Sequence, residues 1–153
     1  MMHLLVQFLL ALIATGGFAL IFRVPIRHIP ACMVIGAIGW VCYEISMYYY
    51  ESPVMGCFLA ACVVGLLSQF AAKFLKDAAT IFIIPGILCL VPGSKIFNTM
   101  AALLDEDISE AAQIGTETLM MAGAIAVGLL VMGALIRVAR SIVRKTIRLK
   151  DLI

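Results

Sequence analysis

The stretch from Ala79 to Phe97 is as apolar as a membrane span, yet two Pro-Gly pairs interrupt it. Pro85 and Pro92 lie seven residues apart, so a helix would place both on nearly one face. Each proline removes a backbone donor and frees a carbonyl one turn earlier, near Ile81 and Leu88. Hydrocarbon tolerates such groups only where protein or a water-filled cavity satisfies them. We therefore expect this segment to bend or unwind, so that residues 84–94 do not form one regular helix.

An apolar segment broken by glycine and proline is the best sequence-level indication of a transporter's binding site. A helix that is kinked only for packing is the alternative, because prolines are common in membrane helices. The sequence leaves both interpretations open. The candidate substrate-binding residues in this segment are Pro85, Gly86, Pro92, Gly93, Ser94 and Lys95.

The composition indicates an integral membrane protein. Of 153 residues, 64% are hydrophobic and 13% are charged, whereas soluble domains have about half apolar and about a quarter charged residues. Apolar segments at about 4–22, 30–50, 54–72, 79–97 and 119–139 are each near the length that crosses a bilayer. The first segment lacks the basic flank and the cleavage site of a signal peptide, so we interpret it as a retained span. The predicted fold is one all-α membrane domain over residues 1–153, with five spans and a broken fourth span.

The basic residues predict how the spans are oriented. The loop after the first span, the loop after the third span and the tail 137–153 hold ten of the eleven Lys and Arg residues. Lys95 alone lies on the other side. The positive-inside rule then places the N-terminus outside and the C-terminus in the cytoplasm.

The residues after Pro92 form the most specific candidate site. If a half-helix begins at Pro92, the backbone donors of Gly93, Ser94 and Lys95 lie in its first turn, at the positive end of the dipole. Such a helix start suits a carboxylate, as half-helix N-termini do in transporters. The alternative is that Lys95 only reaches toward the membrane interface.

Two residues of the second span are further candidates. Glu44 lies within the span, where carboxylates are costly and often functional, although it is close to the outer interface. Trp40 requires a partner for its indole N–H if it is buried, which makes it a possible cavity wall.

Other kinds of site have little support. The cysteines are odd in number, form no CxxC pair and lie within apolar stretches, so they are interpreted as small apolar residues. His3 and His28 have no Cys or carboxylate at ligand spacing, and no metal or cofactor is expected. No motif joins a nucleophile to a base, so an enzyme is not expected, and no basic-aromatic pattern indicates nucleic acid.

The last third of the chain predicts one long helix. Asp107 is a plausible N-cap with Glu110 at the third helical position, and this helix is expected to continue through the fifth span. The basic residues of its tail share one face beside an apolar stripe, so the tail either binds membrane lipids or only fixes the topology. Pairs of small residues at a spacing of four predict close helix packing: Gly56 with Ala60, Ala61 with Gly65, and Ala124 with Gly128.

An odd number of spans also suggests an incomplete unit. Transporters are often built from inverted repeats, and five-span halves are a familiar unit. No internal repeat is evident in this chain. We therefore expect half of a transporter, completed by a partner or by copies of itself.

The order of these features resembles the small membrane subunit of the threonine/serine exporter family. The resemblance rests on the V-P-x-R loop at residues 24–27, the span from Gly36 to Trp40, the basic loop 73–76 and the sequence L-V-P-G-S at residues 90–94. It covers about residues 10–135. The chain departs from the family at Asp77-Ala78-Ala79, where relatives often carry a proline just before the fourth span, and in its longer basic tail.

The resemblance implies a bacterial inner-membrane exporter of threonine and serine, or of a small dicarboxylate such as succinate. It also implies a larger five-span partner subunit. No ATP-binding motif is present, so an ion gradient or the substrate's own gradient would supply the energy. The alternatives from other classes are a non-transporting scaffold or assembly subunit and an oligomeric channel.

Overall fold

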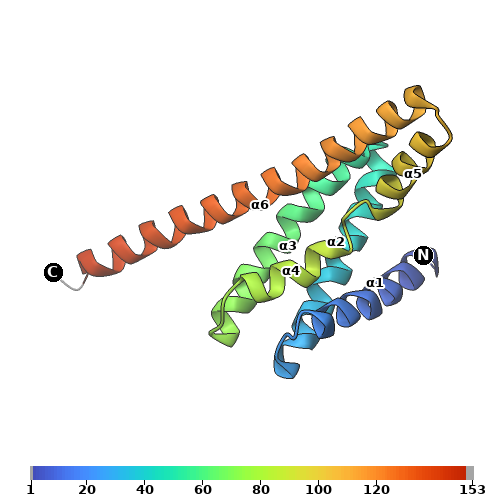
Figure 1. Ribbon diagram of the computed structural model, residues 1–153. Helices are drawn as coiled ribbons and strands as arrows, with labels where there is room; N and C mark the ends of the chain where they lie inside the picture. The colour runs from blue at the N-terminus through green and yellow to red at the C-terminus, as the bar shows by residue number, and fades with distance from the viewer. Residues whose placement is uncertain (1, 151–153) are drawn as a thin grey trace.

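A computed structural model describes residues 2–150 of the chain, and it describes the side chains of residues 4–139, 141 and 142. The described chain is helical throughout, with short connections (Figure 1). Its elements are α1 (Met2–Ile21), the short 3-10 helix η1 (Ile26–His28), α2 (Ile29–Tyr50), α3 (Pro53–Leu75), α4 (Thr80–Leu88), α5 (Gly93–Leu104) and α6 (Ile108–Lys150).

The helices confirm an all-α membrane bundle with a broken fourth span. In the described chain, α1, α2, α3 and α6 are each long and apolar enough to cross a membrane. The pair α4 and α5 meets the same criteria together but bends by 50°, which gives up to five spans. The prediction that residues 84–94 would not form one regular helix is therefore confirmed. This protein is a multi-pass membrane protein.

The last helix is longer than the predicted fifth span 119–139. It begins at Ile108, directly after Asp107, whose Oδ1 accepts a hydrogen bond from the Glu110 amide at 3.0 Å. The predicted N-cap is thus present, and the helix continues unbroken to Lys150. The side chains of Arg140, Arg144 and Arg148 lie outside the described residues, so the basic face of the tail stays a prediction.

Helix α3 lies at the centre of the bundle, between α2 and α6. The small residues predicted to mediate packing lie at its contacts. A Cβ built at Gly128 of α6 would be 2.8 Å from the Phe58 carbonyl oxygen and 3.0 Å from the Ala61 Cβ. A Cβ at Gly56 would be 3.0 Å from the Tyr43 ring. Glycine therefore allows the backbones to approach closely at these points.

The two halves of the broken span have different neighbours. Helix α4 packs against α1, α2 and α3, and its Phe82 is fully buried. Helix α5 instead packs mainly against α6, and the two form an arm that projects from the bundle (Figure 1). The break between Leu88 and Gly93 therefore lies where the chain leaves the packed core.

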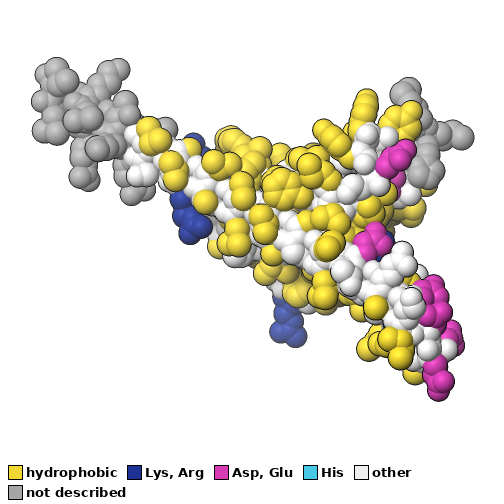
Figure 2. Space-filling model, turned by 90° about the horizontal axis from the view of Figure 1, so that it is seen from above, with side chains coloured by type: hydrophobic (Ala, Val, Ile, Leu, Met, Phe, Trp, Pro, Cys, Tyr) yellow, Lys and Arg dark blue, Asp and Glu magenta, His cyan; other side chains and the backbone are white. Residues whose placement is uncertain are grey.

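Charged side chains separate toward the two ends of the bundle. Figure 2 shows acidic side chains at the end where α5 and α6 meet, and basic side chains toward the other end. Helix α1 begins near the acidic end, and α6 extends past the other helices at the opposite end (Figure 1). The separation of basic from acidic side chains agrees with the pattern on which the positive-inside rule depends.

Cysteine labelling tests which end faces the cytoplasm. We expect an impermeant maleimide to label Asp107→Cys from outside the cell, and Leu149→Cys only after permeabilisation, because the basic loops stay inside. The wild-type protein gives the baseline for the native cysteines. Glu51→Cys should behave like the first variant and Lys76→Cys like the second. Labelling of positions 107 and 149 from one side would contradict the five-span topology.

Candidate functional site

The break in the fourth span occurs at the second Pro-Gly pair. Helix α4 ends at Leu88, and Pro92 is the N-cap of α5 with φ −76° and ψ 63°. The Leu88 carbonyl, which Pro92 leaves without its usual donor, accepts a longer bond from the Val91 amide at 3.4 Å. The Gly93 amide donates to the Val91 carbonyl at 2.8 Å. Tight local turns therefore satisfy the backbone at the break.

The first Pro-Gly pair differs from expectation, because Pro85 lies inside α4 and does not break it. The Ile81 carbonyl freed by Pro85 has another donor, the Cys32 thiol of α2, with Sγ 3.6 Å from the oxygen. A Cβ at Gly86 would be 3.2 Å from a Val64 methyl carbon, so this pair packs tightly against α3. Pro85 and Gly86 are buried within the bundle.

The start of α5 provides unused backbone donors. The first intrahelical bond is donated by the Ile96 amide to the Pro92 carbonyl at 3.1 Å. The amides of Ser94 and Lys95 precede that bond and lie in the first turn, where helices concentrate positive partial charge. Pro92 occupies the N-cap, one residue earlier in the helix than the sequence predicts.

Five candidate residues surround one cavity of about 360 Å³ beside this helix start: Trp40, Pro92, Gly93, Ser94 and Lys95. Tyr43, the segment Cys89–Val91 and Met121 complete its wall. A Cβ built at Gly93 would have no neighbour within 4 Å, so the backbone there is open to the cavity. The volume falls in the range of small-molecule sites, which is about 300–1,000 Å³.

Lys95 forms an ion pair with Glu117 of α6. Both side chains are partly exposed, with 29% and 38% of their surface accessible. The pair joins α5 to α6 directly beside the cavity, and the Thr99 hydroxyl also donates to the Lys95 carbonyl at 2.8 Å. The lysine ammonium of the candidate site is thus already paired with a carboxylate.

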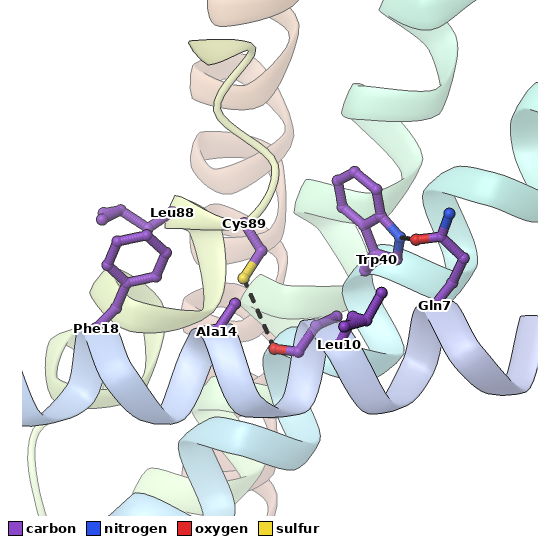
Figure 3. Close-up of a pocket in the computed structure, with 8 residues that line it drawn as sticks. Gln7, Leu10, Ala14, Phe18, Trp40, Leu88 and Cys89 are labelled. Atoms are coloured by element: carbon purple, nitrogen blue, oxygen red, sulfur yellow. Dashed lines mark hydrogen bonds between the residues drawn. The ribbon is translucent and has the colours of Figure 1, made fainter. Parts of the chain in front are cut away.

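A second cavity of about 330 Å³ lies on the other side of Trp40, between α1 and the end of α4 (Figure 3). The Trp40 Nε1 donates to the Gln7 Oε1 at 3.0 Å, which supplies the partner that a buried indole requires. Trp40 and Cys89 line both cavities. The two cavities thus share wall residues at the break.

The break is also tied to α1. The Cys89 Sγ lies 3.0 Å from the Thr15 Oγ1. It also lies 3.9 Å from the Ala11 carbonyl oxygen, a contact drawn as a dashed line from Cys89 in Figure 3. Thr15 is fully buried and donates to the same carbonyl at 2.7 Å. A side chain at Gly36 would overlap Thr15, so glycine in α2 makes room for this contact.

The remaining candidates lie apart from the cavities. Glu44 is half-buried on α2 and does not line either of them. Its carboxylate forms no hydrogen bond or ion pair with another residue whose side chain the structure describes. Pro85 and Gly86 are in the packed core, as given above.

Sequence reasoning did not single out Gln7, Thr15, Cys89 or Glu117 as site residues. The sequence did carry one signal, because Glu117 and Lys95 are opposite charges that flank the same predicted outer loop. Gln7, Thr15 and Cys89 are isolated within apolar spans, and only the fold brings them to the break.

Comparisons with known proteins agree with this architecture. The family model described as "Threonine/Serine exporter, ThrE" matches residues 7–135. A relative from Haemophilus influenzae, described as an uncharacterized protein, is 28% identical over 104 residues. The match covers 68% of this chain but only 35% of that protein. No solved structure matches the chain. Because the family model covers the spans and the break, this chain belongs to the threonine/serine exporter family.

Proposed function

We propose that this chain is one half of a secondary exporter that moves a small carboxylate-bearing metabolite out of a bacterial cell. Threonine and serine are the first candidates, because the family is one of threonine/serine exporters, and a dicarboxylate such as succinate is the second. The substrate would pass the break of the fourth span, at the cavity of about 360 Å³.

One observation carries the proposal: the N-terminus of α5 opens onto this cavity. The Ser94 and Lys95 amides lie in the first turn of the helix, and the side chains of the cavity wall are apolar and polar, with Lys95 the one charged group among them. Backbone donors at a helix start stabilise an anion without any cost of reorganisation. A carboxylate is the group of these substrates that fits such a place.

The Lys95–Glu117 pair supports the same assignment. The Glu117 carboxylate pairs with the Lys95 ammonium. A carboxylate is also the group that the substrate would present to this lysine. The pair is partly exposed, so exchange of one carboxylate for another does not expose a buried charge. In this proposal, the substrate carboxylate takes the place of Glu117 as it enters.

A partner is part of the proposal. Helix α5 packs mainly on α6 and leaves large apolar side chains exposed, among them Phe97 and Leu104. Membrane lipids would cover much of the outer surface, but the path past the break also requires a second wall. We propose that a larger five-span subunit of the same family, or another copy of this chain, supplies that wall. The relative from Haemophilus influenzae is much longer than the stretch it shares with this chain.

Flux measurements test the proposal. The chain is reconstituted alone and with a larger subunit of the family, and efflux of labelled threonine, serine and succinate from vesicles is followed. We expect saturable efflux that requires both chains and is inhibited by an excess of unlabelled substrate. Efflux that does not saturate would support the channel instead. Absence of flux with both chains, together with an assembled complex, would support the scaffold.

A further inference from the structure

A polar cluster lies at the end of α4 opposite the break, where η1 meets the loop between α3 and α4. His28 is 1% exposed, and its Nε2 lies 3.0 Å from the Asp77 Oδ2. The Arg27 Nε lies 2.9 Å from the same His28 Nε2, and the Arg27 Nη2 lies 3.3 Å from the Asp77 Oδ2. The His28 Nδ1 is buried and has no hydrogen-bond partner.

The hydrogen bonds of this cluster depend on where the imidazole carries its proton. If His28 Nε2 accepts from Arg27, the ring proton lies on Nδ1, and the Nε2 lone pair faces the Asp77 carboxylate. If Nε2 carries the proton, it donates to Asp77, and the Arg27 Nε–H loses its acceptor. No single neutral tautomer satisfies both contacts. The arrangement is therefore balanced between two sets of bonds.

We propose that His28 is a reversible proton-binding site with Asp77 as its acceptor and Arg27 as the group that the proton replaces. A proton from hydronium reaches the Nε2 lone pair by way of the Asp77 carboxylate and leaves a water molecule behind, and the new N–H donates to the Asp77 Oδ2. The Arg27 Nε–H then loses its acceptor and turns to water, which is open to it because 72% of its side chain is exposed.

Water reaches the cluster through Asp77. The Asp77 side chain is 27% exposed and lines a cavity of about 320 Å³ together with Gln69 and Lys73. His28 itself is buried and makes a T-shaped contact with the Phe82 ring, with ring centroids 5.4 Å apart. A proton can thus pass by way of the carboxylate to a ring that no bulk water touches.

Charged groups lie near His28 on both sides of the cluster, beside η1 and at the end of α3. The Ala78 amide donates to the Asp77 Oδ1 at 2.9 Å and, with His28 and Arg27, holds the pKa of Asp77 below its ordinary value. Asp77 thus stays ionised through the range in which histidines usually titrate. In the parts of the neighbouring elements next to the cluster, the described titratable groups are Arg23 and Arg27 beside η1, Cys32 near the start of α2, and Lys73, Lys76 and Asp77 at the end of α3 and just after it, whereas α4 contains none.

The site lies at the end of α4 opposite the break in the fourth span. The Asp77 Oδ1 accepts from the Ala78 amide just before α4, and His28 packs against Phe82 of that helix. The other end of α4 forms the break that lines both cavities. A role of the proton in export would rest on the function proposed above, but the proton site itself does not.

Histidine NMR tests the site without substrate or partner. The full chain with labelled histidines, and with His3→Gln to leave one signal, is titrated in detergent. We expect the imidazole of His28 to titrate reversibly. Asp77→Asn should move the midpoint by about one pH unit or more to lower pH, and Arg27→Gln should move it to higher pH, because each removes a charge within about 4 Å. Both variants change partly exposed side chains and keep a side chain of similar size, and the helical signal in circular dichroism checks that each variant is folded.

Lys76→Gln is the matched control, since it removes the same charge as Arg27→Gln from an exposed position in the adjoining loop. It should shift the midpoint much less. An imidazole signal that does not titrate between pH 4 and 9, or one that titrates identically in Asp77→Asn, would overturn the proposal. Because no transport is measured, these outcomes are independent of any failure of the exporter assignment.

Discussion

Replacing Lys95 with Met is expected to lower export by roughly ten- to a hundred-fold. The substitution keeps an apolar stem and removes the charge that, in the proposed site, contacts the substrate carboxylate. A hydrogen bond to a charged group contributes about 1.5–3 kcal/mol, and each 1.4 kcal/mol is a factor of about ten. Initial rates of labelled efflux, normalised to protein in the membrane, measure the effect.

Variants at Glu117 distinguish a substrate contact of Lys95 from an ion pair that only holds α5 against α6. In Glu117→Gln, the competing carboxylate is gone and Lys95 remains, so the substrate concentration at half-maximal rate should fall. In the double variant Lys95→Glu with Glu117→Lys, the pair between α5 and α6 can form again with its charges exchanged. Export should nevertheless stay at least about tenfold reduced, because a carboxylate now lies beside the cavity.

Recovery of export in the double variant would contradict the assignment. The ion pair would then serve only to hold α5 against α6, and the amides after Pro92 would be the whole of the candidate site. Thermal unfolding of each variant shows whether the exchanged pair has restored the contact between the two helices. This control separates loss of the fold from loss of the substrate contact.

The sequence predicted the elements of the fold better than the contacts between them. Apolar run lengths located the spans, because crossing hydrocarbon demands a fixed length of helix. The carboxylate at Asp107 located the start of α6, since capping is local. By contrast, Trp40 meets Gln7 across 33 residues and His28 meets Asp77 across 49. No periodic pattern in a single sequence reports such pairs.

Pro85 illustrates a second limit. The sequence shows that proline frees the Ile81 carbonyl, but whether the helix breaks there depends on a donor from another helix. The Cys32 thiol is that donor. The cysteines were interpreted as small apolar residues, whereas the sulfurs of Cys32 and Cys62 also donate to backbone carbonyls at helix contacts. The candidate residues around Pro92 share a cavity for a simpler reason, because most of them are consecutive in the chain.

Gly128→Ala is expected to destabilise the bundle, although it adds a single methyl group. Its Cβ would lie 2.8 Å from the Phe58 carbonyl oxygen and 3.0 Å from the Ala61 Cβ. The nearest of these is backbone, which cannot rotate away, so α3 and α6 must separate. The bond from the Cys62 thiol to the Gly128 carbonyl, now 3.6 Å long, would weaken as well.

The same substitution at Gly123 provides the control on the same helix. No atom lies within 4 Å of a Cβ built there, so Gly123→Ala should be neutral or slightly stabilising, since alanine favours the helix more than glycine. Overpacking at Gly128 costs about 1–3 kcal/mol, which corresponds to a fall in melting temperature of roughly 2–12 °C for a chain of this size. Thermal unfolding in one detergent measures both variants. Equal melting temperatures for the two variants would show that α3 and α6 are not in close contact at Gly128. Helix association in lipid depends on close contact rather than on burial from water. That result would therefore refute the packing of this bundle around α3.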